Sequence, residues 1–223
     1  MLVIPAINEI EFSEVLKKIN IAGEFSRWIH LDVVDGKFAA NTTWNNPGDL
    51  KAINSGLKAD IEVHLMVENP EVVIKDWVSA GAKRIIISLE ALEKSKLQFK
   101  IQNLFDKNCE IGLAINPETS VEKLIPFISI NQPEIGVNQR LIKFVLVLGV
   151  SPGLAGQKLN ENVLEKIKFL KNYYPGVIIE ADGGIDLETA KLAKEAGVDI
   201  IVSASYIFGS PNPQKAYEDF LNI

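Results

Sequence analysis

The sequence has few of the residues that mark secreted, membrane-bound or nucleic-acid-binding proteins. Its single cysteine, Cys109, cannot form an internal disulfide, which favours a reducing compartment. No apolar run approaches the ~20 residues of a membrane span, and no charged-then-apolar leader opens the chain. With 29 acidic and 23 basic residues the net charge is −6, and no block of Lys and Arg offers a nucleic-acid surface. We therefore expect a cytoplasmic protein without a membrane or nucleic-acid partner.

Short β-branched runs alternate with longer amphipathic stretches along the whole chain. The runs predict strands at Leu2–Ile7, Trp28–Val34, Ile61–Met66, Arg84–Leu89, Ile111–Ile115, Phe144–Val150, Val177–Ala181 and Ile200–Ser203. The stretches between them predict helices such as Phe12–Ile21, Glu71–Ala80, Val121–Ile128, Val163–Tyr173 and Leu187–Ala196. Pro70, Thr119 and Asp186 are expected helix starts, and Gly23, Gly81 and Gly197 expected stops.

Eight such strands, apolar on both faces, predict one (β/α)8 TIM barrel of parallel strands over residues 1–223. An open doubly wound sheet is the competing fold, but it normally carries a glycine-rich turn after its first strand. That turn here is Asn8-Glu9-Ile10-Glu11, which contains no glycine. The polar segment 129–140 reads as an insertion, to which we assign no chemistry.

Both histidines of the chain lie at the ends of predicted strands. His30 and Asp32 alternate along the second strand and so share a face, His64 ends the third, and Asp182 ends the seventh. We expect the two histidines to lie at equivalent depths of neighbouring strands. Imidazole and carboxylate ligands suit one divalent Zn, Fe, Mn or Co ion better than calcium or magnesium. A lone histidine at a strand end is more often a core residue, but two histidines and two aspartates at one mouth favour a metal site.

Glycine and small residues gather after the sixth, seventh and eighth strands. Loops after strands seven and eight, with a short extra helix, usually hold phosphate in such barrels. Here they carry Gly183, Gly184 and Ser205, and Gly153 and Gly156 follow the sixth strand and can close over the same ligand. By contrast, we expect Asp35, just before Gly36, to hydrogen-bond its own turn.

Four segments together resemble the ribulose-phosphate 3-epimerase family. They are His30-Leu31-Asp32-Val33-Val34-Asp35-Gly36-Lys37-Phe38, Val63-His64-Leu65-Met66-Val67-Glu68-Asn69-Pro70, Pro152-Gly153 with Gly156-Gln157-Lys158, and Asp182-Gly183-Gly184-Ile185. The likeness runs in the same order from Pro5 to Phe208. It implies metal ligation by His30, Asp32, His64 and Asp182, with Asp32 and Asp182 also transferring protons.

The resemblance implies a metal-dependent epimerase that converts ribulose 5-phosphate to xylulose 5-phosphate, or a close analogue, in the pentose phosphate pathway. Inverting a carbon beside a ketone removes a proton from one face and returns one to the other, through an enediolate. Two carboxylates on opposite sides of the substrate can do this, and a metal can stabilise the developing charge. The implied partner is a phosphorylated ketose, and the sequence leaves open a homo-oligomer.

The departures from the family cluster around the substrate. Glu9 stands where a serine is expected to touch the sugar, and a carboxylate there would repel the ligand unless it pairs with the metal or a lysine. Val34 and Leu148 replace methionines, although Met66 remains, and Ser88 replaces a histidine. In the phosphate helix Ala204 replaces a glycine. The four implied metal ligands are all present, whereas the residues expected around the sugar differ. The sequence therefore predicts metal binding better than it predicts which sugar is bound.

Two other functions stay open. One is another phosphate-binding barrel isomerase or lyase, such as those of tryptophan or histidine synthesis, which would not depend on the metal. The related sugar-phosphate decarboxylases carry an Asp-x-Lys-x-x-Asp motif that the second strand lacks. The other is a non-catalytic phosphosugar-binding paralogue, since fold and site do not imply turnover.

Overall fold

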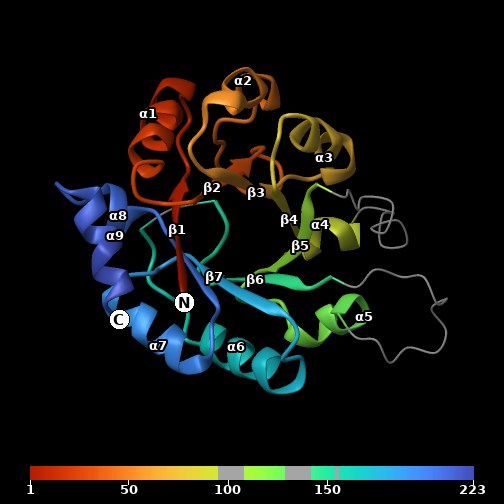
Figure 1. Ribbon diagram of the computed structural model, residues 1–223. Coiled ribbons are helices and arrows are strands. Elements are labelled where there is room, and N and C mark those ends of the chain that lie inside the picture. Colours follow the sequence, from red (N-terminus) through yellow and green to blue (C-terminus); the bar gives the residue numbers. More distant parts are fainter. Residues whose placement is uncertain (95–107, 129–141, 154–155) are drawn as a thin grey trace.

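The computed structural model describes residues 1–94, 108–128, 142–153 and 156–223 and contains a closed barrel of eight parallel strands (Figure 1). The strands are β1 (Leu2–Ile7), β2 (Trp28–Val34), β3 (Asp60–Met66), β4 (Arg84–Ser88), β5 (Glu110–Ile115), β6 (Phe144–Leu148), β7 (Ile178–Asp182) and β8 (Ile200–Ser203). They follow one another in chain order around the barrel, and β8 closes it by pairing with β1. The (β/α)8 TIM barrel expected from the sequence is confirmed.

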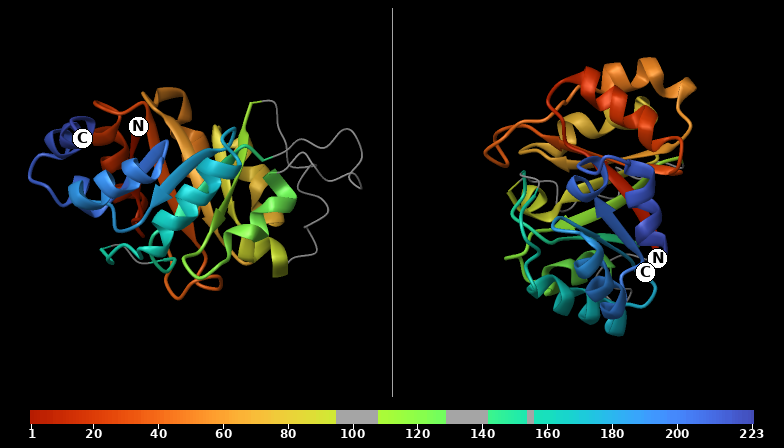
Figure 2. Two further views of the ribbon diagram at one scale, coloured as in Figure 1. Left: turned by 90° about the horizontal axis from the view of Figure 1, so that it is seen from below. Right: turned by 90° about the vertical axis from the view of Figure 1, so that its left-hand side faces the viewer.

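Helices surround the barrel on the outside (Figure 2). They are α1 (Phe12–Ala22), α2 (Pro47–Ile53), α3 (Pro70–Ser79), α4 (Leu89–Lys94), α5 (Ile125–Ile128), α6 (Asn162–Tyr173), α7 (Leu187–Ala196), α8 (Ser205–Phe208) and α9 (Pro213–Leu221), with the 3-10 turns η1 (Asn54–Gly56) and η3 (Val121–Leu124). The chain ends lie close together, as expected where β1 pairs with β8 and contacts α9. Within the described residues, no helix is both long and apolar enough to cross a membrane.

Of the helix starts and stops expected from the sequence, all but Thr119 lie at or next to a helix end. Asp186 caps α7 through a reciprocal capping box with Thr189, and Gly197 ends that helix in the left-handed region at φ 100°. Thr119 does not start the helix expected at Val121–Ile128. Its hydroxyl instead donates to the Glu90 carboxylate, and the segment divides into η3 and α5. The insertion expected at 129–140 lies outside the described residues.

Apolar side chains form two separate layers. The larger lies between the strands and the helices and includes Trp77, Ile29 and Leu65, all fully buried. The smaller fills part of the barrel interior and comes from β1, β4, β5, β6 and β8, with Phe144 as its largest side chain. The remaining interior faces belong mainly to β2, β3 and β7, and these carry the buried histidines and carboxylates.

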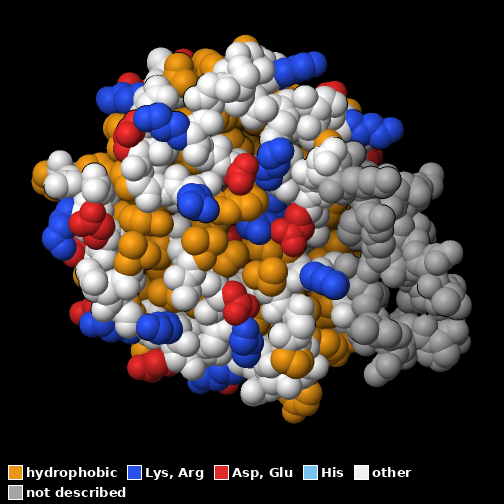
Figure 3. Space-filling view, in the orientation of Figure 1, with side chains coloured by type: hydrophobic (Ala, Val, Ile, Leu, Met, Phe, Trp, Pro, Cys, Tyr) orange, Lys and Arg blue, Asp and Glu red, His pale blue; other side chains and the backbone are white. Residues whose placement is uncertain are grey.

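Charge on the molecular surface is mixed. In the space-filling view basic and acidic side chains alternate over the face, with apolar side chains between them (Figure 3). No block of one sign stands out on that face, which agrees with the mixed charge pattern of the sequence.

Candidate metal and substrate site

The four expected metal ligands meet inside the mouth of the barrel. His30 and Asp32 point inward from β2, His64 from β3 and Asp182 from β7, and each offers an atom within 4.8 Å of the others. The expectation of equal depth for the histidines is wrong. Asp32 pairs in register with His64, whereas His30 pairs with Glu62 one inward-facing step below. The rings still adjoin, with centroids 5.7 Å apart, because the inward faces of the two strands converge.

Asp32 is the centre of this group. Its Oδ1 lies 3.3 Å from His30 Nε2 and 3.3 Å from His64 Nδ1. Both imidazoles are fully buried, and among the described residues neither ring nitrogen of His64 has a hydrogen-bond partner. A buried polar atom without a partner costs free energy, and the contact of His64 Nδ1 with Asp32 still leaves Nε2 without one among the described residues.

The two aspartates have opposite acid–base character. Burial disfavours the charge on Asp32, but the imidazoles of His30 and His64 outweigh burial and lower the pKa of its carboxyl. Burial, together with the charge of Asp32, raises the pKa of Asp182 to about 7. Two carboxyl groups whose pKa values are pushed apart are a common arrangement for an acid and a base in one site.

The histidines also differ. Burial lowers the pKa of His64. Burial acts in the same direction on His30, but hydrogen bonds to Asp32 and Glu62 outweigh it and raise the pKa of His30 well above its ordinary value. Two imidazoles and two carboxylates, with one imidazole nitrogen that has no hydrogen-bond partner among the described residues, fit a borderline divalent ion such as zinc, iron, manganese or cobalt.

A cavity of about 560 Å³, a volume that includes space open to solvent, lies above this group. Asp32 and Asp182 both line it. The cavity is also lined by these residues, which the sequence analysis had identified: Met66, Gly153, Gly156, Gly183, Gly184, Ala204 and Ser205. Val34 and Leu148, where the sequence departs from the family, line the cavity too, whereas Ser88 does not. Asn8 and Thr43 line the cavity as well, and Asn8 was not expected there.

Glu9 does not line this cavity. Its carboxylate is paired with Lys18, and Asn8 takes the place beside the cavity. The Lys18 ammonium also lies 4.9 Å from the centre of the Phe208 ring. The lysine partner considered from the sequence is therefore present, and it draws the carboxylate away from the mouth.

The loop after β7 approaches the neighbouring loop closely through two glycines in the left-handed region. Gly183 has φ 92° and Gly184 φ 71°. A Cβ on Gly184 would lie 2.4 Å from the Leu159 backbone nitrogen, so no side chain fits there. Outside the helices and strands of the described chain, no hydrogen bond uses the amide of Gly184 or Ser205 as donor. Both amides are thus available to an anion in the cavity.

Loop hydrogen bonds hold the end of β2 in place. The Asp35 carboxylate accepts from the amides of Lys37 and Phe38, as expected of a turn, and also from the amide of Glu68 after β3. The Thr43 hydroxyl donates to the Asp32 carbonyl at 2.6 Å and accepts from the Val34 amide at 2.9 Å. Asp35 therefore has a structural role, because it joins two loops beside the candidate metal ligands.

A second group of charges, here called the floor cluster, closes the opposite end of the barrel. It consists of Glu62, Arg84 and Glu110 with the rings of Trp28 and Phe144. Arg84 donates to Glu62 Oε2 at 2.5 Å and to Glu110 Oε2 at 2.7 Å. Its guanidinium carbon lies 4.5 Å from the centre of the Trp28 ring and 3.8 Å from that of Phe144. The sequence reasoning missed this cluster.

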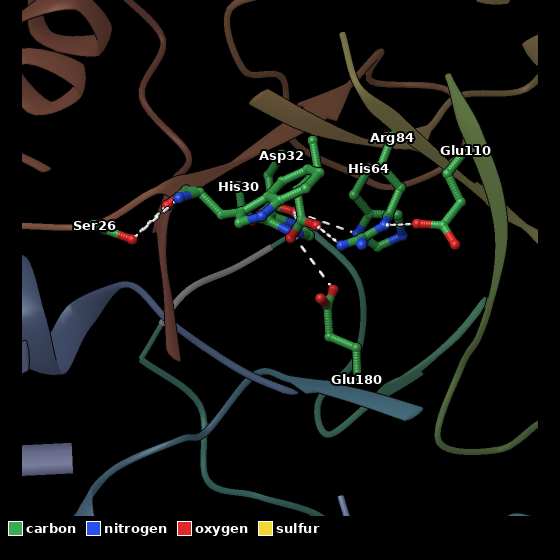
Figure 4. Close-up of polar contacts among 9 residues, drawn as sticks. Ser26, His30, Asp32, His64, Arg84, Glu110 and Glu180 are labelled. Atoms are coloured by element: carbon green, nitrogen blue, oxygen red, sulfur yellow. Dashed lines mark hydrogen bonds and ion pairs between the residues drawn. The ribbon is translucent and has the colours of Figure 1, made fainter. Parts of the chain in front are cut away.

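Glu180 lies between the floor cluster and the metal group. It points from β7 towards His30, with 3.7 Å between its Oε1 and His30 Nδ1 (Figure 4). It is fully buried, and neither carboxylate oxygen has a hydrogen-bond partner among the described residues. Burial and the charge of Glu62 raise its pKa well above the ordinary value.

A closed (β/α)8 barrel with buried imidazoles and carboxylates below a cavity lined by glycine loops is typical of barrel enzymes whose active site lies at the C-terminal ends of the strands. The family model described as the ribulose-phosphate 3 epimerase family matches residues 2–208. The chain belongs to this family, and it is an epimerase, an isomerase that acts on carbohydrates.

Curated relatives agree over most of the chain. The ribulose-phosphate 3-epimerase of Chlamydia muridarum is 38% identical over 196 residues, which cover 85% of this chain and 79% of the relative. The cytoplasmic isoform of Oryza sativa is 33% identical, covering 87% of this chain and 84% of the relative. That of Helicobacter pylori strain 26695 is 32% identical and covers 100% of this chain and 98% of the relative.

Solved structures show the same fold at low identity. KGPDC from Streptococcus mutans, solved in complex with D-R5P, gives a TM-score of 0.70 at 15% identity and covers 99% of this chain and 95% of its own. Orotidine 5′-phosphate decarboxylase from Pyrococcus horikoshii gives 0.67 at 15% identity, with 99% and 98% covered. At this identity the likeness concerns the fold alone.

Proposed function

We propose that this protein is a cytoplasmic, metal-dependent epimerase that inverts the carbon next to the ketone of a ketose phosphate. Ribulose 5-phosphate, or a close analogue, is the substrate, and xylulose 5-phosphate or its counterpart is the product. The observation that carries the proposal is the pair Asp32 and Asp182, which face one cavity from β2 and β7 with oppositely shifted pKa values.

The two carboxyl groups suit the two halves of the reaction. Asp32 is held ionised by its imidazole neighbours and can take a proton from the carbon beside the ketone. Asp182, with a pKa of about 7, can carry a proton at neutral pH and return it to the opposite face. A substrate carbon between them would thus change configuration without either group moving.

His30, Asp32, His64 and Asp182 are the residues that would hold the ion. When bound, a zinc, iron, manganese or cobalt ion supplies positive charge for the developing enediolate oxygen. The protein's own part is to keep the imidazoles buried and fixed and to aim both carboxylates into the cavity. Preorganised groups of this kind need little rearrangement during the reaction.

The phosphate would bind where the loops after β7 and β8 meet. No backbone hydrogen bond outside the helices and strands of the described residues uses the amides of Gly184 and Ser205 as donors, and the loop that carries Gly153 and Gly156 lines the same cavity. Backbone donors accommodate an anion without a basic side chain, which fits the acidic net charge. Fixing the phosphate would set the reacting carbon between the two carboxylates.

The apolar wall of the cavity bears on the identity of the sugar. Val34 and Leu148 line it, at positions where the resemblance leads one to expect methionine. Valine is the shorter side chain, so it leaves more room beside Met66 than a methionine would. Ribulose 5-phosphate remains the first substrate to test, and ketose phosphates with larger sugars come next.

Solvent exchange tests enolisation directly. Protein loaded separately with each of the four metals is incubated with ketose phosphates in D2O, and deuterium entering the carbon beside the ketone is followed by NMR. We expect exchange together with formation of the epimer, and loss of both on chelation. A fully loaded protein that exchanges no deuterium into any ketose phosphate would contradict the proposal.

Substitution of each aspartate by asparagine separates turnover from binding. Asp182→Asn and Asp32→Asn keep the side-chain size but remove a proton carrier, so we expect at least a ~10²-fold lower rate. Ketose phosphate binding, measured by calorimetry at saturating metal, should change less than the rate. Metal content is measured for each variant, because both residues are also proposed ligands.

A further inference from the structure

The two histidines of the site are held in different ways. His64 contacts one carboxylate, that of Asp32, through Nδ1, and its Nε2 has no hydrogen-bond partner among the described residues, whereas His30 has a carboxylate on each side. His30 Nδ1 lies 2.8 Å from Glu62 Oε1, and its Nε2 lies 3.3 Å from Asp32 Oδ1. The orientation of the His30 ring therefore depends on a residue outside the metal group.

Glu62 is itself fixed by the floor of the barrel. Its second oxygen accepts from Arg84 at 2.5 Å, and Arg84 is held by Glu110 and lies against the Trp28 and Phe144 rings. Trp28, Arg84, Glu110 and Phe144 are each the first residue of a strand, so the barrel's hydrogen-bond register fixes where they stand. Glu62 is fully buried and has little freedom to turn away.

A carboxylate accepts hydrogen bonds and does not donate them. The ring nitrogen that faces Glu62 must then carry the proton, and the other nitrogen of a neutral imidazole keeps its lone pair. Here the first is Nδ1 and the second is Nε2, which faces Asp32. Because Asp32 also accepts, the metal-free ring can carry a proton on each nitrogen. Once a cation takes the place of the Nε2 proton, the Glu62 contact keeps the remaining proton on Nδ1 and so selects the tautomer that binds through Nε2.

We propose that Glu62 is a positioning residue for the metal site: held by Arg84, it fixes His30 as the tautomer whose Nε2 faces Asp32 and His64. The proposal rests on the metal-dependent function proposed above, and it assigns Glu62 no contact with substrate. Partners of this kind behind a metal-bound histidine change metal affinity about 10- to 100-fold when they are replaced.

Glu180 provides a matched control. It is as buried as Glu62, belongs to the same barrel interior and also points at His30 Nδ1, but at 3.7 Å rather than 2.8 Å. Unlike Glu62, it has no hydrogen-bond partner among the described residues. If a hydrogen bond positions His30, Glu62→Gln should weaken metal binding and Glu180→Gln should not.

The test measures the affinity of Zn²⁺ by competition with a chromophoric chelator for wild type, Glu62→Gln and Glu180→Gln. Unfolding curves taken in chelator verify that the metal-free variants fold. We expect a Kd about 10- to 100-fold higher for Glu62→Gln and within about 3-fold of wild type for Glu180→Gln. An unchanged Kd for Glu62→Gln, or equal losses in both variants, would overturn the proposal. Wild type that binds no divalent metal would instead overturn the proposed function.

A second measurement reads the tautomer itself. Because the chain has only two histidines, long-range ¹H–¹⁵N spectra of the zinc-loaded protein resolve each ring. We expect His30 to show a protonated Nδ1, with a slowly exchanging proton that exchanges faster in Glu62→Gln. A zinc-bound Nδ1 on His30 in wild type would contradict the positioning role, whatever the affinities.

Discussion

The floor and the mouth of this barrel both bury charged side chains, but they balance them differently. At the floor, each Glu62 oxygen has a hydrogen-bond partner, and Arg84 joins two carboxylates and contacts two rings. At the mouth, His64 has no hydrogen-bond partner in the described chain, and the Asp182 pKa is raised to about 7 by burial and by Asp32. The floor is a completed network, whereas the mouth contains an imidazole nitrogen without a hydrogen-bond partner among the described residues and a carboxyl group whose ionisation is disfavoured.

The contrast indicates that the two ends of one interior serve different needs. A buried, fully paired network resists change, because removing one member leaves the others without a partner. A cluster of unpaired ligands costs stability in the folded protein and regains it when a cation binds. The charges with a structural role thus lie at the floor of the barrel and the proposed reactive charges at its mouth, and His30 lies between the two groups.

Removing the cation of the floor should have the largest effect on stability. Arg84→Met keeps much of the apolar stem but leaves Glu62 buried without its guanidinium partner. We expect a loss of about 3–5 kcal/mol in the free energy of unfolding, the usual result of breaking a buried ion pair. Urea unfolding of metal-free protein measures it. Lys215→Met, which removes an exposed pair with Asp219, serves as the control and should leave the free energy of unfolding nearly unchanged. Equal losses in both variants would contradict the contrast between buried and surface pairs.

At the mouth, a substitution should stabilise the metal-free protein. The folded pKa of Asp182 is about 7 against an ordinary value of 3.8, so its neutral form stabilises the fold below pH 3.8 and that contribution is lost as pH rises to 7. Asp182→Asn has no such loss. Its stability relative to wild type should rise between pH 4 and pH 8, by at most about 4 kcal/mol.

Unfolding curves at both pH values, with chelator and with Zn²⁺, test this expectation. In chelator the advantage of Asp182→Asn should grow with pH. With zinc it should shrink or reverse, because wild type gains more from the ion when Asp182 ligates it. A stability difference independent of pH in chelator would mean that Asp182 titrates normally in the folded chain.

The fold followed from the sequence because a parallel barrel leaves a strong apolar signal. Strands that are covered on both faces appear in the sequence as unbroken apolar runs. Seven of the eight predicted strands both begin and end within one residue of the observed bounds. The sixth was predicted two residues too long, to Val150. That His30 and Asp32 point to the same side followed from the alternation of side chains along a strand. Helices α2, α4 and α9 were not among the stretches assigned as helices from the sequence.

The floor cluster was missed although the sequence carried a signal for it. Glu62 stands two residues before His64, and Glu180 two before Asp182, so both share an inward face with a ligand. A glutamate in an otherwise apolar strand, two residues before an expected ligand, therefore indicates a buried carboxylate inside the barrel. What the sequence could not give was the register, which sets Glu62 beside His30 and Arg84. That register depends on the tilt of strands around the closed barrel.

Glu9 offers the smallest expected effect and tests where the mouth ends. Its carboxylate pairs with Lys18 and lies outside the cavity, so Glu9→Ser should remove a partly exposed ion pair worth about 1 kcal/mol or less. We expect kcat and KM for ribulose 5-phosphate to stay within about 2-fold of wild type. Asn8→Ala, which changes a residue that lines the cavity, is the matched comparison and should raise KM more.

If Glu9 contacts a different sugar, Glu9→Ser would instead weaken activity on that sugar and raise it on ribulose 5-phosphate. Steady-state kinetics with several ketose phosphates decide between these outcomes, and a selective change would place Glu9 in the substrate site in spite of its pairing with Lys18.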